Sequence, residues 1–240
     1  MQLPSTTRRA LARQNRARLC NVARCPKNRR DCANWCLAHS RANSRYGDPL
    51  GMRLYAKEYH HEFLTAKRFL ARHRDHAGIR HALSFVADWF ADACAAQSPS
   101  EAQRHLVRLH RHGVQPSDVL REVVAVHLFQ EAHPQRFPTD RTLTFAFGIA
   151  VAFLAPMPSH DSYLHTRESG GTRRHYHAAS AVAREQLGKE VRHQLSPLFV
   201  RIAVALADEV RHKAAREAAI AAPFVFTTHN AAPQRKRVAA

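Results

Sequence analysis

The sequence predicts a mostly α-helical protein in which a small N-terminal module precedes an all-α helical bundle. Four of the five cysteines lie between residues 20 and 36, in a stretch with few apolar side chains. From residue 53 onward, apolar side chains recur at three- and four-residue steps, the spacing of amphipathic helices, and no convincing strand pattern interrupts them. We therefore expect a basic arm over residues 1–19, a compact module over residues 20–50, an all-α domain over residues 51–222 and a basic, disordered tail over residues 223–240.

The first segment is an arginine-rich arm that could be either a helix or a disordered chain. Its cations are Arg8, Arg9, Arg13, Arg16 and Arg18, with alanine and leucine between them. Such a segment is solvated when free, and it can order when a polyanion holds its charges.

The cysteine-rich stretch has the spacing of a metal site. Four residues separate Cys20 from Cys25, two separate Cys36 from His39, and ten mostly polar residues lie between the pairs. Two close ligand pairs joined by a short loop suit one tetrahedral structural zinc ion, with one pair on a knuckle and the other on the first turn of a helix. A four-cysteine site with Cys32 in place of His39 is the alternative. Because apolar residues are few here, metal binding would supply the folding free energy.

These residues resemble a short zinc-binding module that occurs in phage and other bacterial mobile-element proteins, often ahead of an HNH endonuclease domain. After the four ligands, the resemblance continues through Arg41, Arg45 and Gly47-Asp48-Pro49. The chain departs from the pattern before the third cysteine, where residues 33–35 replace the usual small residue and glycine and the loop is one residue longer. The resemblance covers about 30 of 240 residues and implies a treble-clef-like module that contacts nucleic acid. No HNH pattern follows downstream.

The first half of the helical domain carries three amphipathic segments. We predict helices over residues 54–73, 79–95 and 99–112. Ser98 is expected to cap the third of these helices, Pro99 to occupy its first position and Gly113 to end it. The aromatic residues expected in the core are Phe63, Phe85, Trp89 and Phe90, and Cys94 is expected to be a small core residue.

The second half is expected to contain the centre of the bundle. We predict helices over residues 116–133, 139–155 and 173–219, the last broken or kinked at Pro197. Residues 143–154 are apolar on every side, which is typical of a buried central helix. Residues 159–172 are predicted to form a mobile loop.

The charge of the chain points to a polyanionic partner. Net charge is +18 and the isoelectric point is near 10.9. Residues 1–49 hold eleven Lys or Arg against two Asp, so half of the excess lies in a fifth of the chain. A basic segment joined to a small metal module is the footprint of a protein that neutralises phosphates. A merely soluble, arginine-rich protein is the alternative. The predicted contacts are the five arm arginines, then Lys27, Arg29 and Arg30 in the loop, and Arg41, Asn43 and Arg45 after His39, with Asn43 and Arg45 reading bases.

Catalytic motifs are absent from the sequence. It contains no glycine-rich phosphate loop and no Gly-x-Ser-x-Gly elbow. Three Glu-x-x-His pairs could in principle build a di-metal site in a bundle, but charged neighbours favour surface ion pairing. These pairs are Glu58 with His61, Glu190 with His193, and Glu209 with His212. We therefore expect no enzymatic activity.

The sequence as a whole predicts a zinc-containing nucleic-acid-binding protein of a phage or mobile element. Duplex DNA is the expected ligand, and the role is that of a regulator or an accessory factor in recombination or transposition. The helical domain would form a homo-oligomer or dock a partner protein. The alternatives are an RNA-binding protein and an assembly scaffold in which zinc is purely structural. The longest apolar run is too short to span a bilayer, so we expect no membrane contact and a cytoplasmic location in a bacterial or phage-infected cell.

Overall fold

The computed structural model describes residues 5–155, 162–166, 172–176 and 179–221. The chain divides into two compact units, residues 1–200 and 201–240, and each is considered by itself. As predicted, the fold is mostly helical. The predicted segment boundaries at residues 19, 50 and 222 stay predictions, and the predicted tail lies outside the described residues.

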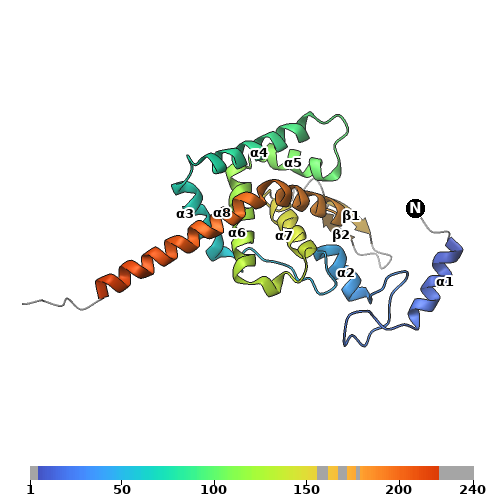
Figure 1. The fold of residues 1–240 in the computed structure, drawn as a ribbon. Coiled ribbons are helices and arrows are strands. Elements are labelled where there is room, and N and C mark those ends of the chain that lie inside the picture. Colours follow the sequence, from blue (N-terminus) through green and yellow to red (C-terminus); the bar gives the residue numbers. More distant parts are fainter. Residues whose placement is uncertain (1–4, 156–161, 167–171, 177–178, 222–240) are drawn as a thin grey trace, which may run out of the picture. The chain divides into compact units, whose positions relative to one another are not determined.

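The N-terminal part contains two helices, α1 (Ser5–Arg16) and α2 (Leu37–Tyr46), which Figure 1 shows in blue. The predicted arm is therefore helical over most of its length. The end of α1 is fixed to the cysteine-rich loop by Asn15, which is buried and donates to the carbonyl oxygen of Asp31 at 2.7 Å. Helix α2 ends where Gly47 adopts a φ of 81°, a left-handed conformation that favours glycine.

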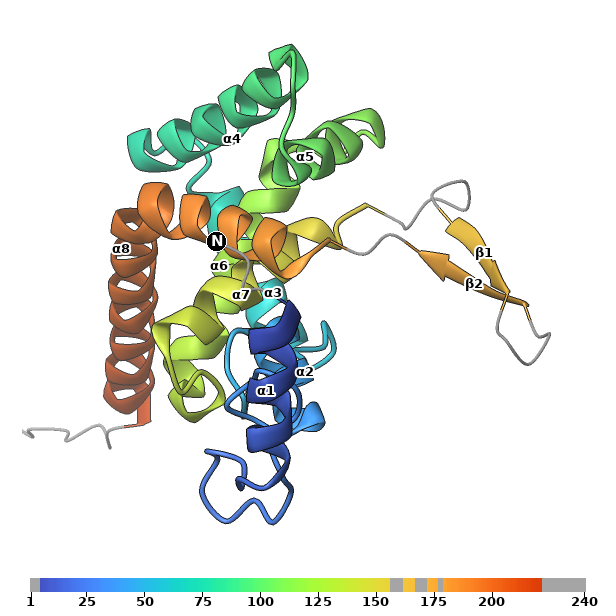
Figure 2. The same cartoon turned by 90° about the vertical axis from the view of Figure 1, so that its right-hand side faces the viewer.

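The bundle follows, with α4 and α5 lying side by side and α6 and α7 beneath them in both views (Figures 1 and 2). Its elements are α3 (His60–Arg72), α4 (Ala77–Ala95), α5 (Glu101–Arg111), α6 (Pro116–Ala132), the 3-10 turn η1 (Pro134–Arg136), α7 (Asp140–Ala152) and α8 (Ala181–Ala221). None of the helices in the described ranges combines the length and apolar character that crossing a membrane requires.

The core lies around α6 and α7. Phe145 and Phe147 of α7 are at most 1% exposed, and most of the α7 side chains are buried. The prediction of a buried central helix is therefore confirmed for residues 143–152, whereas Phe153, which follows the helix, is 46% exposed. Among the aromatic residues expected in the core, Phe90 is buried, whereas the other three are half-buried: Phe63, Phe85 and Trp89.

Helices α7 and α8 cross in direct backbone contact through two glycines. A Cβ added to Gly148 would lie 1.8 Å from the carbonyl oxygen of Arg184, and one added to Gly188 would lie 1.8 Å from the carbonyl oxygen of Thr144. The contact is reciprocal. The glycine of each helix lies against a backbone carbonyl of the other helix, and that carbonyl belongs to the residue four positions before the other helix's own glycine. No larger residue fits at either position.

Three predicted boundaries in the bundle were wrong. Helix α3 begins at His60 instead of residue 54, because the carboxylate of Glu58 accepts a hydrogen bond from the backbone N–H of Tyr55 and holds a turn there. Helix α5 begins after Ser100, whose side chain forms a capping box with Gln103. The prediction for Cys94 was also wrong, because this residue is exposed on α4.

The third boundary concerns the segment between α7 and α8. A two-stranded antiparallel hairpin replaces part of the predicted loop and the predicted start of α8 (Figure 2). Strands β1 (Ser162–Thr166) and β2 (Thr172–Tyr176) pair in a register that joins Ser162 to Tyr176 and Thr166 to Thr172. Threonine and tyrosine favour strands, so this segment carried a strand signal that its glycines obscured. Helix α8 continues through Pro197, so the predicted break there was wrong, while the predicted kink stays a prediction.

Candidate metal centre

The first ligand pair lies on a short knuckle. Leu19 and Asn28 form an antiparallel bridge, and the backbone N–H of Cys20 donates to the carbonyl oxygen of Lys27 at 2.9 Å. Between them the chain reverses through Arg24, which has a φ of 61°. This turn brings Cys25 back toward Cys20.

The second ligand pair lies at the start of α2. Cys36 is the N-cap residue, with extended backbone, and His39 lies in the first turn of the helix. Two backbone hydrogen bonds join the segment before α2 to the rest of the module, Asn21 N–H to Asn34 O and Arg30 N–H to Trp35 O, both at 3.0 Å. The knuckle and the helix start are therefore held face to face.

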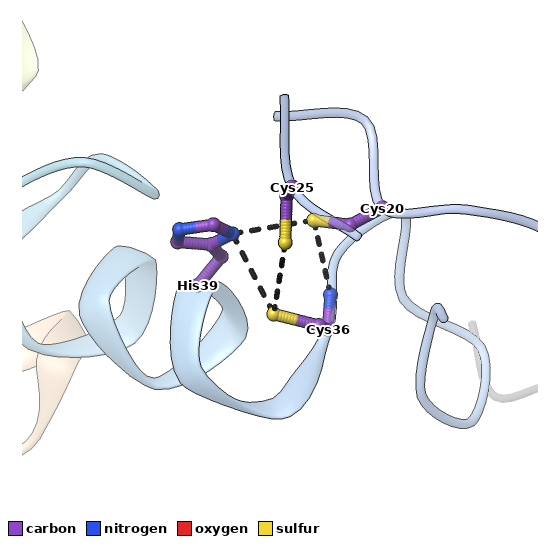
Figure 3. Close-up of side chains that lie close together, drawn as sticks. All are labelled: Cys20, Cys25, Cys36 and His39. Carbon is purple, nitrogen blue, oxygen red and sulfur yellow. Dashed lines mark hydrogen bonds between the residues drawn. The ribbon is translucent and has the colours of Figure 1, made fainter. Parts of the chain in front are cut away.

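Cys20, Cys25, Cys36 and His39 converge, and their ligand atoms all lie within 4.8 Å of one another (Figure 3). The Sγ atoms of Cys20 and Cys36 lie 3.3 and 3.5 Å from His39 Nδ1, and the Sγ atoms of Cys25 and Cys36 lie 4.0 Å apart. Tetrahedral zinc, with bonds of about 2.3 Å to sulfur and about 2.0 Å to nitrogen, separates its ligands by about 3.5–3.8 Å. The geometry of the cluster can hold one metal ion.

The electrostatics of the cluster also suit a cation. The backbone N–H of His39 lowers the pKa of the Cys36 thiol. The backbone N–H of Cys36 in turn donates a hydrogen bond to Cys20 Sγ at 3.3 Å. At Cys25, the backbone N–H of Lys27 lowers the pKa, but burial and the neighbouring thiols outweigh it, so the pKa is raised. Three thiolates this close repel one another, and a bound divalent cation would offset that repulsion.

Cys32 is not part of the cluster. It is exposed, and its Sγ lies 3.7 Å from the carbonyl oxygen of Arg8. The structure brings together the preferred ligand set with His39, and not the alternative set with Cys32.

The predicted nucleic-acid contacts are mostly exposed. Nine of the eleven residues are on the surface: Arg8, Arg9, Arg13, Arg16, Arg18, Lys27, Arg30, Arg41 and Arg45. Arg29 is half-buried and donates to the carbonyl oxygen of Leu19 at 3.0 Å. Asn43 is also half-buried, and its Oδ1 lies 3.4 Å from a guanidinium nitrogen of Arg141. Arg29 and Asn43 thus have structural contacts, and their contact with nucleic acid stays a prediction.

The module is docked on the bundle through α2, which sequence reasoning did not foresee. Gly47 lies against Phe145 and the carbonyl oxygen of Arg141, both on α7. Arg184 of α8 donates to the carbonyl oxygen of Arg45 at 3.3 Å. These contacts fix the helix that bears three predicted nucleic-acid contacts, Arg41, Asn43 and Arg45. The long sequence separation of the partners left no local signal for them.

The Glu-x-x-His pairs do not form a second metal site. Within the described ranges, the three cysteines and His39 are the one cluster able to hold a metal. Glu58 instead forms an ion pair with Arg136 at 2.6 Å, while His61 is exposed. The expected ion pairing of Glu58 therefore occurs, but with a partner on η1.

Comparison of the chain with models of known protein families, with curated proteins and with solved structures gives no match. The likeness of residues 20–49 to the mobile-element module therefore rests on the ligand pattern and on the cluster that these ligands form.

Proposed function

We propose that the chain is a nucleic-acid-binding protein in which one structural zinc ion fixes a basic surface for duplex DNA. The observation that carries this proposal is the position of the metal cluster within an arginine-rich segment in which Asp31 is the one acidic residue before Asp48. No Asp or Glu occurs before Asp31, whereas nine Lys or Arg do. The cluster holds the loop and α2 in place, so their exposed cations stand on a rigid frame.

The donor set supports zinc over other metals. Three thiolates and one imidazole in a tetrahedral arrangement are typical of structural zinc sites, whereas hard cations such as magnesium and calcium prefer oxygen ligands. All four ligand positions are filled by protein, which leaves no open position for a substrate. In this proposal the metal is structural, and the protein acts by binding rather than by catalysis.

The biological setting that we propose, a phage or mobile element, is based on the same N-terminal residues. The ligand pattern, the arginines after His39 and the Gly-Asp-Pro ending resemble a module of phage and mobile-element proteins. We propose a role as regulator or accessory factor in recombination or transposition, in the cytoplasm. The helical bundle would then form an oligomer or dock a partner protein.

The test is fluorescence anisotropy of labelled duplex DNA against salt concentration. The native protein should bind with a steep negative salt slope, close to 0.9 in log–log units for each phosphate contact. Replacing the arm arginines Arg8, Arg9 and Arg13 with Gln should reduce that slope by up to about 2.7, since each lost phosphate contact removes about 0.9.

Two cysteine variants separate the module from the arm. Cys36→Ser removes a ligand and should weaken binding at least tenfold, whereas Cys94→Ser changes an exposed cysteine of α4 and should have no effect. Equal binding by Cys36→Ser and native protein would mean that the arm acts alone. Tighter binding to structured RNA than to duplex DNA would replace DNA by RNA as the ligand. Absence of binding to both would leave the scaffold alternative.

A further inference from the structure

A second site candidate lies in the bundle, away from the metal cluster. It is a pocket of about 220 Å³ between the segment that precedes α3 and helices α6 and α7. Most of its wall is apolar. Tyr55 and Phe153, which are large and about half exposed, also line it, so apolar surface is open to solvent here. The apolar lining residues are Leu54, Ala56, Ala146, Ile149, Ala150, Phe153 and Leu154.

One polar pair lines this pocket. Tyr59 is 6% exposed, and its hydroxyl donates to Oε1 of Glu122 on α6. Burial raises the pKa of Tyr59 strongly, so this phenol stays protonated and remains a donor. The second oxygen of the carboxylate, Oε2, makes no hydrogen bond within the described part of the chain, and it retains accessible surface.

Glu122 also has no cation paired with it in the described ranges. The charge of the neighbouring Arg121 lowers the pKa of Glu122 in part, but Arg121 forms its ion pair with Asp118, at 2.5 Å, and lies over the ring of Phe63. Arg53, which also lines the pocket, stacks on Tyr55 with its guanidinium carbon 4.7 Å from the ring centre. Burial of the carboxylate raises the pKa of Glu122, a cost that a bound cation would offset.

We propose that this pocket binds a small organic ammonium compound with a short apolar body. The ammonium would donate to Glu122 Oε2, and the apolar body would lie against Ile149, Phe153 and their neighbours. Ligand pockets for drug-sized molecules hold roughly 300–1,000 Å³, so this one selects a smaller compound. The inference is independent of the nucleic-acid proposal, because it uses no residue of the metal module.

The chemistry of the pocket distinguishes among ligand charges. A neutral molecule gains only the burial of its apolar surface, and an anion is repelled by Glu122. The net charge of +18 disfavours general binding of cations to this chain. If the protein prefers an amine, the attraction must therefore come from the carboxylate in the pocket, because the net charge of the whole chain repels cations.

The experiment is a ligand-observed NMR titration of the full chain with three six-carbon probes of different charge. Hexylamine should bind saturably at one site. Hexan-1-ol should bind at least tenfold more weakly, and hexanoate more weakly still. Equal affinity for the amine and the alcohol would overturn the proposal, as would the absence of amine binding.

Matched variants then locate the site. Glu122→Gln keeps the shape of the side chain and an acceptor for Tyr59, and it should weaken amine binding at least tenfold without changing alcohol binding. Glu131→Gln is the control, because this exposed carboxylate lies on the same helix outside the pocket. Ala56→Trp should fill the pocket from an exposed position outside any helix, where a larger side chain is expected to leave the fold intact, and it should abolish binding of both probes. Amine binding that survives Glu122→Gln or Ala56→Trp would contradict the proposed site.

Discussion

At the scale of single residues, Gly47 meets two demands at once. It ends α2 with a φ of 81°, which L-residues rarely adopt, and it lies where α2 meets α7. A Cβ at this position would lie 2.8 Å from Phe145 Cδ2 and 2.9 Å from the carbonyl oxygen of Arg141. The glycine therefore serves both the end of the helix and the docking of the metal module.

Gly47→Ala should consequently destabilise the protein by about 2–4 kcal/mol. About 1–2 kcal/mol comes from the left-handed conformation, and the remainder from overpacking against α7. Gly113→Ala is a matched control, since Gly113 has a φ of 73° but no atom within 4 Å of the added Cβ. Urea unfolding should show the larger loss for Gly47. Equal losses for the two variants would mean that the contact with α7 contributes nothing.

The members of the candidate metal cluster could be predicted because their signal is local. Cys20, Cys25, Cys36 and His39 are close in sequence, and few backbone geometries satisfy that spacing. Cys32 lies within the same stretch, so spacing alone left it open, and only the folded loop places it outside the cluster. The residues that support the site from the bundle were not predictable, because pairs such as Arg184 with Arg45 are 139 residues apart.

At the scale of elements, the crossing of α7 and α8 depends on the absence of two side chains. Gly→Ala in a helix interior normally stabilises by up to about 1 kcal/mol. At Gly148 the sign should reverse, because the added Cβ would meet the backbone of α8 and not a movable side chain. We expect a loss of about 3 kcal/mol or more.

Gly188→Ala should cost a similar amount, because the contact is reciprocal. The double variant should lose less than the sum, since helices separated by one alanine already have room for the second. Gly78→Ala in α4 is the control, as its nearest neighbours are the His76 ring at 3.3 Å and the end of the Leu198 side chain. Full additivity in urea unfolding would argue against a shared crossing point.

The elements were predicted where hydrophobic periodicity decides the structure, and missed where side-chain hydrogen bonds or pairing decide it. Residues 143–154 are apolar all round, and α7 is the buried helix they predict. The start of α3 depends instead on Glu58 and its bond to the Tyr55 N–H, which periodicity does not record. The hairpin of β1 and β2 was missed because its strands are short and the glycines between them obscured the strand signal of their threonines and tyrosines.

At the scale of the whole molecule, the two parts of residues 1–200 are stabilised by different physics. The bundle buries large apolar side chains, among them Leu106, Leu120 and Phe145. Between residues 17 and 36 the buried side chains are only Cys20 and Cys36, both members of the candidate metal cluster. The burial of apolar surface can therefore hold the bundle, whereas the module would depend on the proposed metal.

Removal of the metal should therefore unfold the module and leave the bundle folded. The chain carries a probe in each part, since its two tryptophans are Trp35 in the module and Trp89 on α4. Addition of a strong zinc chelator should move the indole N–H signal of Trp35 in a ¹⁵N-correlated NMR spectrum to its unfolded position, while that of Trp89 stays. Returning zinc should restore the first signal, because structural zinc supplies about 10–16 kcal/mol to such modules. If both signals moved together, the contacts of α2 with α7 would have to couple the two parts strongly enough for them to unfold as one. If neither moved, the module would fold without metal, and the structural role of zinc would be wrong.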